Sequence, residues 1–82
     1  MKNMSVLLSS INSVKDFVNI VSKYECDIDL VSGRYVVDAK SIMGIFSLDL
    51  TKPITVRVDK ESCADRLFAE LEPYNADTQP KK

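Results

Sequence analysis

The sequence Lys-Ser-Ile-Met-Gly-Ile-Phe-Ser-Leu-Asp-Leu occupies residues 40–50 and sets the interpretation of the whole chain. Ser41 follows a strand-like segment at 34–38 and is placed to cap a short helix by accepting a hydrogen bond from a free backbone N–H. The apolar residues behind it are too many for the one narrow stripe that a short helix buries. They are Ile42, Met43, Ile45, Phe46 and Leu48. We therefore expect some of them at the surface, where exposed Ile and Met side chains often form docking sites.

The same stretch suits a modification. A helix N-terminus has free N–H groups and a partial positive charge, and Lys40 adds a full one, so a phosphate on Ser41 would be tolerated there. The alternative is that Ser41 is only a helix cap and that the apolar residues after it are core.

Composition limits the classes of function. The chain has 82 residues, of which 45% are hydrophobic and 28% charged, as in one small globular domain. Eleven basic residues against twelve acidic ones, without a basic cluster, give no electrostatic reason to bind nucleic acid. The apolar stretch at 4–8 is too short for a signal peptide, and no stretch approaches a membrane span. We expect a cytoplasmic protein that neither binds nucleic acid directly nor inserts into a membrane.

The two cysteines, Cys26 and Cys63, form no C-x-x-C pair and lie on different predicted elements. We expect both to be free buried thiols in a reducing compartment. With two cysteines and no histidine, a zinc site of nitrogen and sulfur ligands cannot be completed. Asp27 and Asp29 lie on one outward strand face, and we expect a solvated surface there and no metal site.

Two amphipathic helices are predicted from apolar residues that recur every three or four positions. The first would begin at Ser13, where Asp16 completes a weak capping box, and would end near Lys23. The second would begin at Ser62 and end before Pro73, which cannot continue a helix. The apolar faces are Val14, Phe17, Val18 and Val21 in the first helix and Ala64, Leu67, Phe68 and Leu71 in the second.

Strands are predicted where apolar residues form a short run or alternate with polar ones, at 4–8, 26–30, 34–38 and 54–59. A turn at Ser32-Gly33 would join the second and third strands, since glycine supplies the positive φ that a hairpin needs. The element order β-α-β-β-α-β-α predicts an α+β open-faced sandwich, an antiparallel sheet with helices on one face. Residues 1–74 would form the domain, and 75–82 a flexible C-terminal tail.

Three segments then stand out together. They are Ser22-Lys23-Tyr24, Asp27-x-Asp29-Leu30 and Lys40-Ser41-Ile42-Met43-Gly44-Ile45-x-Ser47-Leu48. Over 22–50, without a gap, the sequence resembles the HPr family, the histidine-containing phosphocarriers of the bacterial sugar phosphotransferase system. The resemblance implies a four-stranded antiparallel sheet with strand order 1-4-2-3 and three helices packed on one face.

In the HPr family, a histidine at the start of the first helix carries the phosphate, with an arginine nearby and a proline after it. This chain contains no histidine. The resemblance places Ser10 at the histidine position, Asn12 at the arginine position and Ser13 at the proline position. Because a serine phosphate is a stable ester and not an activated phosphoramidate, we expect no phosphocarrier activity and no catalytic residue.

The family's regulatory site is retained in the sequence. Ser41 matches the serine that a dedicated ATP-dependent kinase phosphorylates, after which family proteins bind a LacI-type transcription regulator in carbon catabolite repression. The resemblance assigns partner contacts to Lys40, Ile42, Met43, Ile45 and Ser47. Asp49 departs from the family, which usually has glycine at this position, and it adds negative charge near the docking helix.

Three functions follow as hypotheses. The first is a regulatory or adaptor protein related to the phosphotransferase system and switched at Ser41. Its partners would be an HPr-type serine kinase and a LacI-type regulator or another component of that system. The second is a divergent phosphocarrier that uses another nucleophile, such as Ser10 or Ser13. The third is a structural or oligomerisation domain that has kept only the fold. We favour the first, in which the protein is not an enzyme and uses no cofactor.

Overall fold

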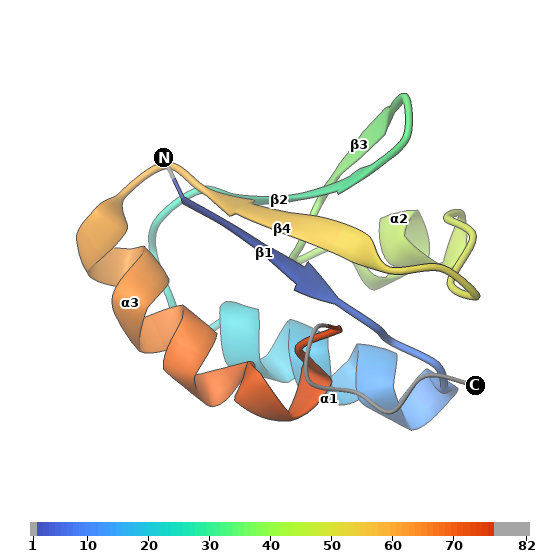
Figure 1. Cartoon of the computed structure of the whole chain (residues 1–82), viewed down its shortest axis with the longest axis horizontal. Coiled ribbons are helices and arrows are strands. Elements are labelled where there is room, and N and C mark those ends of the chain that lie inside the picture. The colour runs from blue at the N-terminus through green and yellow to red at the C-terminus, as the bar shows by residue number, and fades with distance from the viewer. Residues whose placement is uncertain (1, 77–82) are drawn as a thin grey trace.

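Four antiparallel strands form one sheet in the computed structural model, which describes residues 2–76 (Figure 1). The strands are β1 (Lys2–Val6), β2 (Ile28–Ser32), β3 (Tyr35–Asp38) and β4 (Ile54–Val58). Their order in the sheet is β1-β4-β2-β3, and each neighbouring pair is antiparallel. The predicted sheet and its strand order are therefore confirmed.

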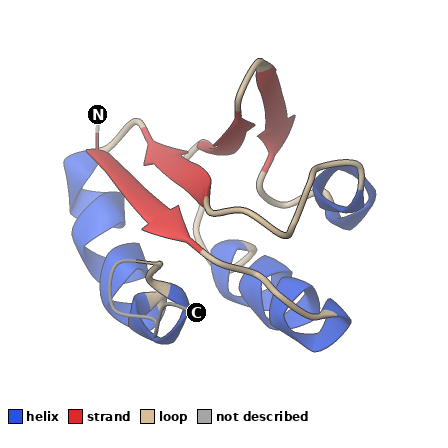
Figure 2. Ribbon diagram, turned by 45° about the vertical axis from the view of Figure 1, so that its right-hand side comes forward, coloured by secondary structure: helices blue, strands red, loops and turns tan. Residues whose placement is uncertain are grey.

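The helices are α1 (Ile11–Val21), α2 (Ile42–Phe46) and α3 (Glu61–Glu70), followed by a one-turn 3₁₀ helix, η1 (Glu72–Tyr74). Figure 1 and Figure 2 show α1 and α3 side by side along one face of the sheet, with α2 beside the end where β3 leads into it. Among residues 2–76, no helix lies on the opposite face of the sheet (Figure 2). This is the open-faced α+β sandwich that the element order predicted.

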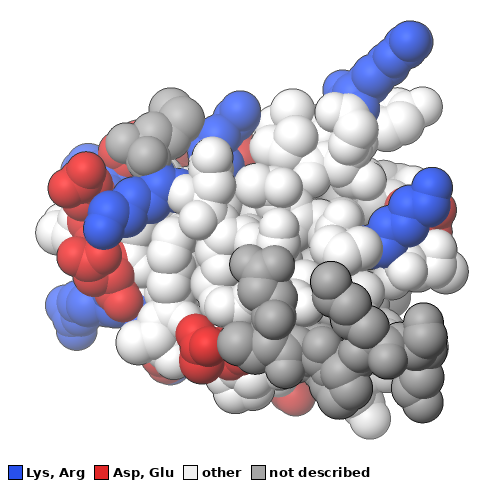
Figure 3. All heavy atoms as spheres, viewed as in Figure 1, with Lys and Arg blue, Asp and Glu red and all other residues white. Residues whose placement is uncertain are grey.

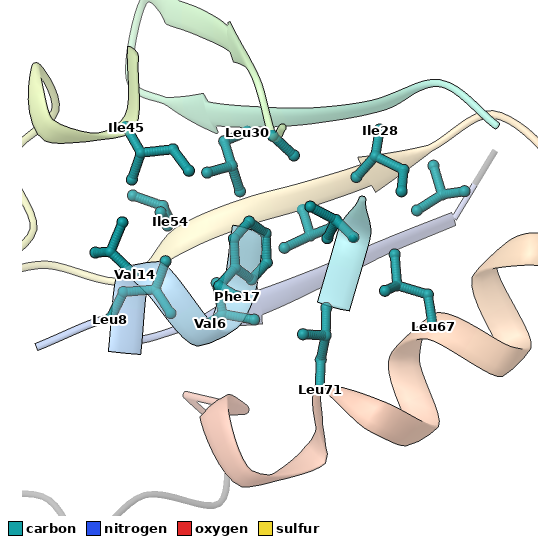
Figure 4. Packing of buried hydrophobic residues seen from close by; sticks show 14 of the residues in the cluster. Val6, Leu8, Val14, Phe17, Ile28, Leu30, Ile45, Ile54, Leu67 and Leu71 are labelled. Atoms are coloured by element: carbon teal, nitrogen blue, oxygen red, sulfur yellow. The ribbon is translucent and has the colours of Figure 1, made fainter. Parts of the chain in front are cut away.

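The core lies between the sheet and the helices. Along β4, Ile54, Val56 and Val58 are buried, whereas Thr55 and Arg57 face the open side. Phe17 of α1 is completely buried and points at the sheet, among Val6, Leu30 and Ile54 (Figure 4). Fully burying one such side chain stabilises the fold by about 1.5–3 kcal/mol, so this apolar layer fixes the positions of α1 and α3.

The start of α1 differs from the sequence prediction. The helix begins at Ile11, and its N-cap is Ser10, whose Oγ accepts a hydrogen bond from the Ser13 backbone N–H at 3.1 Å. Ser13 is therefore the donor in the first turn and not the cap, so the predicted capping box with Asp16 is wrong. Both serines have the right chemistry, and the sequence pattern did not decide between them.

The start of α3 also differs. The helix begins at Glu61, and its N-cap, Lys60, makes no side-chain capping bond, so Ser62 is not the cap. The Glu61 carboxylate lies in the first turn, where the helix dipole favours negative charge, and this gives the helix a start without a hydroxyl cap. The helix ends at Glu70, before Pro73 as predicted.

The strand boundaries shift by a few residues. β1 and β2 run over Lys2–Val6 and Ile28–Ser32 instead of 4–8 and 26–30, because pairing with β4 sets their limits. The hairpin turn consists of Gly33 and Arg34, with a φ of 59° at Gly33. A positive φ at the first central residue only is the pattern of a type II′ turn, which matches the twist of a hairpin.

The C-terminal segment continues the fold past the predicted domain limit at residue 74. Asn75 forms a β-bridge with Val6, and the Ala76 N–H donates to the Ser5 carbonyl at 2.9 Å. These contacts cover part of the outer edge of β1. The rest of the predicted tail, residues 77–82, lies outside the described residues.

Cys26 and Cys63 are joined by a disulfide, so the prediction of two free thiols is wrong. Their Cα atoms are 6.6 Å apart, within the range of native disulfides. The sequence could not show that the first turn of α3 lies against the residues before β2. In the chain-entropy account, a link across 37 residues stabilises the folded state by about 3–4 kcal/mol.

Candidate functional site

The candidate site is built around the start of α2. Ser41 is the N-cap, with extended backbone (φ −99°, ψ 103°), and its Oγ accepts a hydrogen bond from the Gly44 N–H at 3.2 Å. Ser41 is exposed. A Cβ at Gly44 would lie 3.2 Å from Ser41 Oγ and 3.4 Å from Val37 Cβ, so glycine allows this close packing of the cap against β3.

The side chains of α2 divide between core and surface. Ile45 is completely buried, and Leu48 beyond the helix is also buried. Met43 is 77% exposed and Phe46 is 40% exposed, whereas Ile42 is half-buried against the core. The excess of apolar residues in this segment therefore does leave large apolar side chains at the surface. Ile45, which the resemblance assigned to partner contacts, supports that surface from beneath.

Lys40 and Ser47 flank the helix and hold its ends. Lys40 Nζ donates to the Tyr24 backbone carbonyl at 2.6 Å, so its ammonium group fastens the segment after α1 to the start of α2. Ser47 is the C-cap, and its Oγ donates to the Gly44 carbonyl at 2.5 Å. Both residues position α2, and only part of each side chain is available to a partner.

Asp49 adds a fixed negative charge just after α2. Its Oδ1 accepts hydrogen bonds from the Thr51 Oγ1 at 2.5 Å and from the Thr51 N–H at 3.1 Å. These two bonds are the main reason that the pKa of Asp49 is lowered from 3.8, its ordinary value. The carboxylate is therefore ionised at neutral pH, in a turn next to the candidate site.

The start of α1 is the second place to which the resemblance assigned chemistry. Ser10 and Asn12 are exposed, and Ser10 Oγ lies 2.9 Å from Ser13 Oγ as well as capping the helix. Ile11 between them is 63% exposed. The first residues of α1 and α2 lie at the same end of the molecule's longest axis (Figure 1). The groups at the start of α1 are hydroxyls and an amide, which provide no activated nucleophile.

A cluster between α1 and α3 was not predicted. Glu70 forms an ion pair with Lys23 (Nζ–Oε1 2.7 Å) and accepts a hydrogen bond from the Tyr24 hydroxyl. The Lys23 hydrogen bond, followed by that of Tyr24, lowers the pKa of Glu70, and the bond to Glu70 raises the pKa of Tyr24. The partners are 46 and 47 residues apart, so no local sequence pattern could reveal them.

This cluster borders an open hollow of about 740 Å³. Its walls are formed by Lys23, Tyr24, Glu25, Cys63, Arg66 and Glu70. Figure 3 shows charged side chains of both signs gathered at the end where α3 begins, while the middle of that face is mostly uncharged. Cys63 therefore lies next to side chains of both charges.

Metal sites and membrane-spanning helices do not occur in the described part of the chain. Residues 2–76 hold no group of three or more carboxylate, thiol or imidazole side chains placed to bind a metal. Among the same residues, no helix has the length and apolar character of a membrane span. Asp29 instead pairs with Arg57 on the open face of the sheet, at 3.3 Å.

Comparison with known proteins gives a consistent result. A family model described as the PTS HPr component phosphorylation site matches residues 12–74. Comparison with well-characterised protein sequences gives no significant match. Among solved structures, HPr-C-His from Thermoanaerobacter tengcongensis is 26% identical, with a TM-score of 0.70 over 88% of this chain and 92% of that one.

Two further solved structures are similar. A phosphocarrier protein HPr from Bacillus anthracis str. Ames is 26% identical, with a TM-score of 0.70 over 90% of this chain and 94% of that one. The histidine-containing phosphocarrier protein of Mycoplasma is 16% identical, with a TM-score of 0.71 over 88% of this chain and 89% of that one. At that identity, the Mycoplasma protein supports the fold alone.

Proposed function

The chain belongs to the HPr family of the bacterial phosphotransferase system, and we propose that it is a regulatory or adaptor protein switched by phosphorylation of Ser41. The observation that carries this proposal is the exposed Ser41 hydroxyl at the N-cap of α2, next to the exposed Met43 side chain, in a chain without histidine. The protein acts by binding and not by catalysis.

The start of α1 supports the first half of this proposal. A phosphocarrier needs an imidazole whose phosphoramidate passes its phosphate on readily, and the chain offers Ser10 at that position. A phosphate on Ser10 would be a stable ester, and Asn12 supplies no positive charge to assist its transfer. We therefore propose that the histidine-dependent carrier activity of the family is absent.

The surroundings of Ser41 support the second half. A phosphate on Oγ brings a charge of about −1.5 to −2 at neutral pH and strong acceptor oxygens. It would stand at the N-terminus of α2, the helix that carries the exposed side chains of Met43 and Phe46. A partner with an arginine beside an apolar recess can bind the phosphate and the apolar side chains together. Without the phosphate, only the apolar side chains are available to it.

We define the docking surface as Ser41, Ile42, Met43, Phe46 and Ser47. Its partners in the proposal are an HPr-type serine kinase, which adds the phosphate from ATP, and a LacI-type transcription regulator or another phosphotransferase-system component. The setting is the bacterial cytoplasm, in carbon catabolite repression. Asp49 repels an acidic partner surface and so favours a basic one.

Binding measurements test the proposal. The protein is phosphorylated with an HPr-type serine kinase and ATP, and its affinity for a LacI-type regulator is measured by calorimetry. We expect Ser41→Ala to abolish the phosphorylation-dependent complex. Met43→Asp should weaken binding about 30-fold, the size of a hot-spot loss. Val36→Asp is the matched control, because Val36 is 53% exposed and lies on β3, outside the docking surface.

The proposal is wrong if the phosphorylated and unmodified proteins bind the regulator equally. It is also wrong if Met43→Asp binds as tightly as Val36→Asp. Labelling from phosphoenolpyruvate and enzyme I would support the alternative of a divergent phosphocarrier, and Ser10→Ala would then remove the label.

A further inference from the structure

We propose that the Cys26–Cys63 disulfide is a thiol–disulfide exchange site, opened at Cys63 by a small cysteine-derived thiol that enters the hollow beside α3. The two sulfurs differ in access. Cys26 is only 4% exposed and belongs to the core cluster, whereas Cys63 is half-buried and forms part of the wall of the hollow. A thiol approaching through the hollow therefore meets the Cys63 sulfur first.

The position of Cys63 in α3 favours the same assignment. It is the third residue of a ten-residue helix, where free backbone N–H groups and the helix dipole favour negative charge. Once reduced, Cys63 would be the more reactive cysteine, and Cys26 would be protected by the core. A disulfide with one accessible, activated sulfur is typical of redox-sensing pairs in reducing compartments.

The walls of the hollow indicate which thiols fit. Lys23 and Glu70 are paired with each other in this wall, and Arg66 and Glu25 add one further positive and one further negative charge beside Cys63. Small thiols derived from cysteine carry both carboxylate and ammonium groups, so each of their charges finds an opposite one there. The volume of about 740 Å³ and the open mouth admit a molecule of tripeptide size.

The chemistry balances with two equivalents of such a thiol. The first thiolate attacks Cys63 Sγ; the bond between the cysteines breaks, and its electron pair goes to Cys26 Sγ, which takes up a proton. A mixed disulfide remains on Cys63. A second thiolate attacks the small-molecule sulfur of that mixed disulfide, releasing Cys63 and a small-molecule disulfide. Two electrons and two protons pass from the small thiols to the protein.

Opening the disulfide changes the contacts near α2. Cys26 lies in the connection between α1 and β2. In the same connection, the Tyr24 carbonyl accepts the hydrogen bond from Lys40 Nζ. Reduction removes the covalent link between this connection and α3 and leaves the Lys23–Glu70 ion pair and the Tyr24–Glu70 hydrogen bond in place. We expect faster backbone amide exchange around Cys26. The inference concerns the sulfur chemistry alone and does not depend on phosphorylation of Ser41.

The test uses the wild-type protein and reduced glutathione as the probe. Air-oxidised protein is incubated with glutathione, quenched with acid, alkylated with iodoacetamide after denaturation and mapped by peptide mass spectrometry. We expect about tenfold more glutathione on Cys63 than on Cys26, because exchange follows access to the sulfur. Equal labelling, a preference for Cys26, or two free thiols in the air-oxidised protein would overturn the proposal.

Variants sharpen the result. Cys26→Ser keeps only Cys63 and should react with glutathione disulfide about tenfold faster than Cys63→Ser does in the folded state, but equally fast in urea. Circular dichroism checks that both variants are folded, and the wild-type map decides the matter if either is not. Arg66→Gln should slow exchange with glutathione about threefold but not with uncharged mercaptoethanol. Arg34→Gln, in the β2–β3 turn, is the control.

Discussion

The starts of α1 and α2 have the same local structure and different surroundings. Each helix is capped by a serine, Ser10 or Ser41, whose Oγ accepts a hydrogen bond from the N–H three residues on, at 3.1 and 3.2 Å. α1 then runs for eleven residues and buries Val14, Phe17 and Val21, whereas α2 has five residues and leaves Met43 exposed.

The comparison shows that a capping serine assigns no function by itself. At α1 the capping residue, Ser10, is the one that the sequence resemblance aligned with the family's histidine, and the helix behind it buries Val14, Phe17 and Val21 in the core. An exposed apolar side chain follows each cap, Ile11 at α1 and Met43 at α2, but α2 exposes a second one, Phe46, on a helix of only five residues. The proposed regulatory role therefore depends on what surrounds Ser41 and not on its hydrogen bond.

The two helices should differ most in how much their side chains contribute to the free energy of unfolding. Phe17→Ala removes a completely buried ring and should lower the free energy of unfolding by about 3–5 kcal/mol. Met43→Ala, on the exposed face of α2, should change it by less than about 0.5 kcal/mol. Urea unfolding followed by circular dichroism measures both. A comparable loss for the two variants would mean that α2 is as much part of the core as α1.

The two capping serines should differ less in their contributions to the free energy of unfolding. Ser10→Ala should lower the free energy of unfolding by about 1 kcal/mol, a typical value for a lost cap. Ser41→Ala should cost about half as much, because a five-residue helix carries less of the fold. The double variant should show the sum of the two losses. If Ser41→Ala were the more damaging change, Ser41 would be chiefly structural.

The smallest expected effect concerns two carboxylates. Asp49 follows α2 in the chain, and Glu70 is paired with Lys23, just after the end of α1. Lys23 and then Tyr24 lower the pKa of Glu70 from 4.5, and Thr51 lowers that of Asp49 from 3.8. A lowered folded-state pKa adds stability above the unfolded-state pKa, and that stability is lost as the pH falls through the folded-state pKa.

We therefore expect Glu70→Gln to reduce the loss of stability on acidification below about pH 4.5. Asp49→Asn should do the same at somewhat lower pH. Urea unfolding at a series of pH values measures the effect, and carboxyl NMR titration gives each pKa directly. A Glu70 pKa above that in the unfolded chain would show that Lys23 and Tyr24 do not stabilise its ionised form.

Local patterns determined much of the fold. The alternation of Ile54, Val56 and Val58 after Pro53 predicted β4 to within one residue at its C-terminal end. Ser41 was correctly predicted as a cap, since it is a hydroxyl residue directly before the apolar run of α2. At α1, Ser10 and Ser13 were equivalent as patterns, and the packing of Val14, Phe17 and Val21 against the sheet decided where the helix began.

Contacts between distant segments could not be predicted in this way. The Cys26–Cys63 disulfide, the Lys23–Glu70 ion pair and the hydrogen bond from Lys40 to the Tyr24 carbonyl all join separate elements. Each depends on how the helices lie against the sheet. The candidate site was found from sequence because it is one continuous segment, although the burial of Ile45 became clear only from the fold.

The measurement that tests the central claim most directly is a mass spectrum of the protein after treatment with an HPr-type serine kinase and ATP. We predict one added phosphoryl group, which fragmentation places on Ser41 and not on Ser10, and none on the Ser41→Ala variant. An unmodified protein, in a reaction where a control HPr is phosphorylated, would contradict the account, as would a phosphate on Ser10. The start of α2 would then be a helix cap like that of α1.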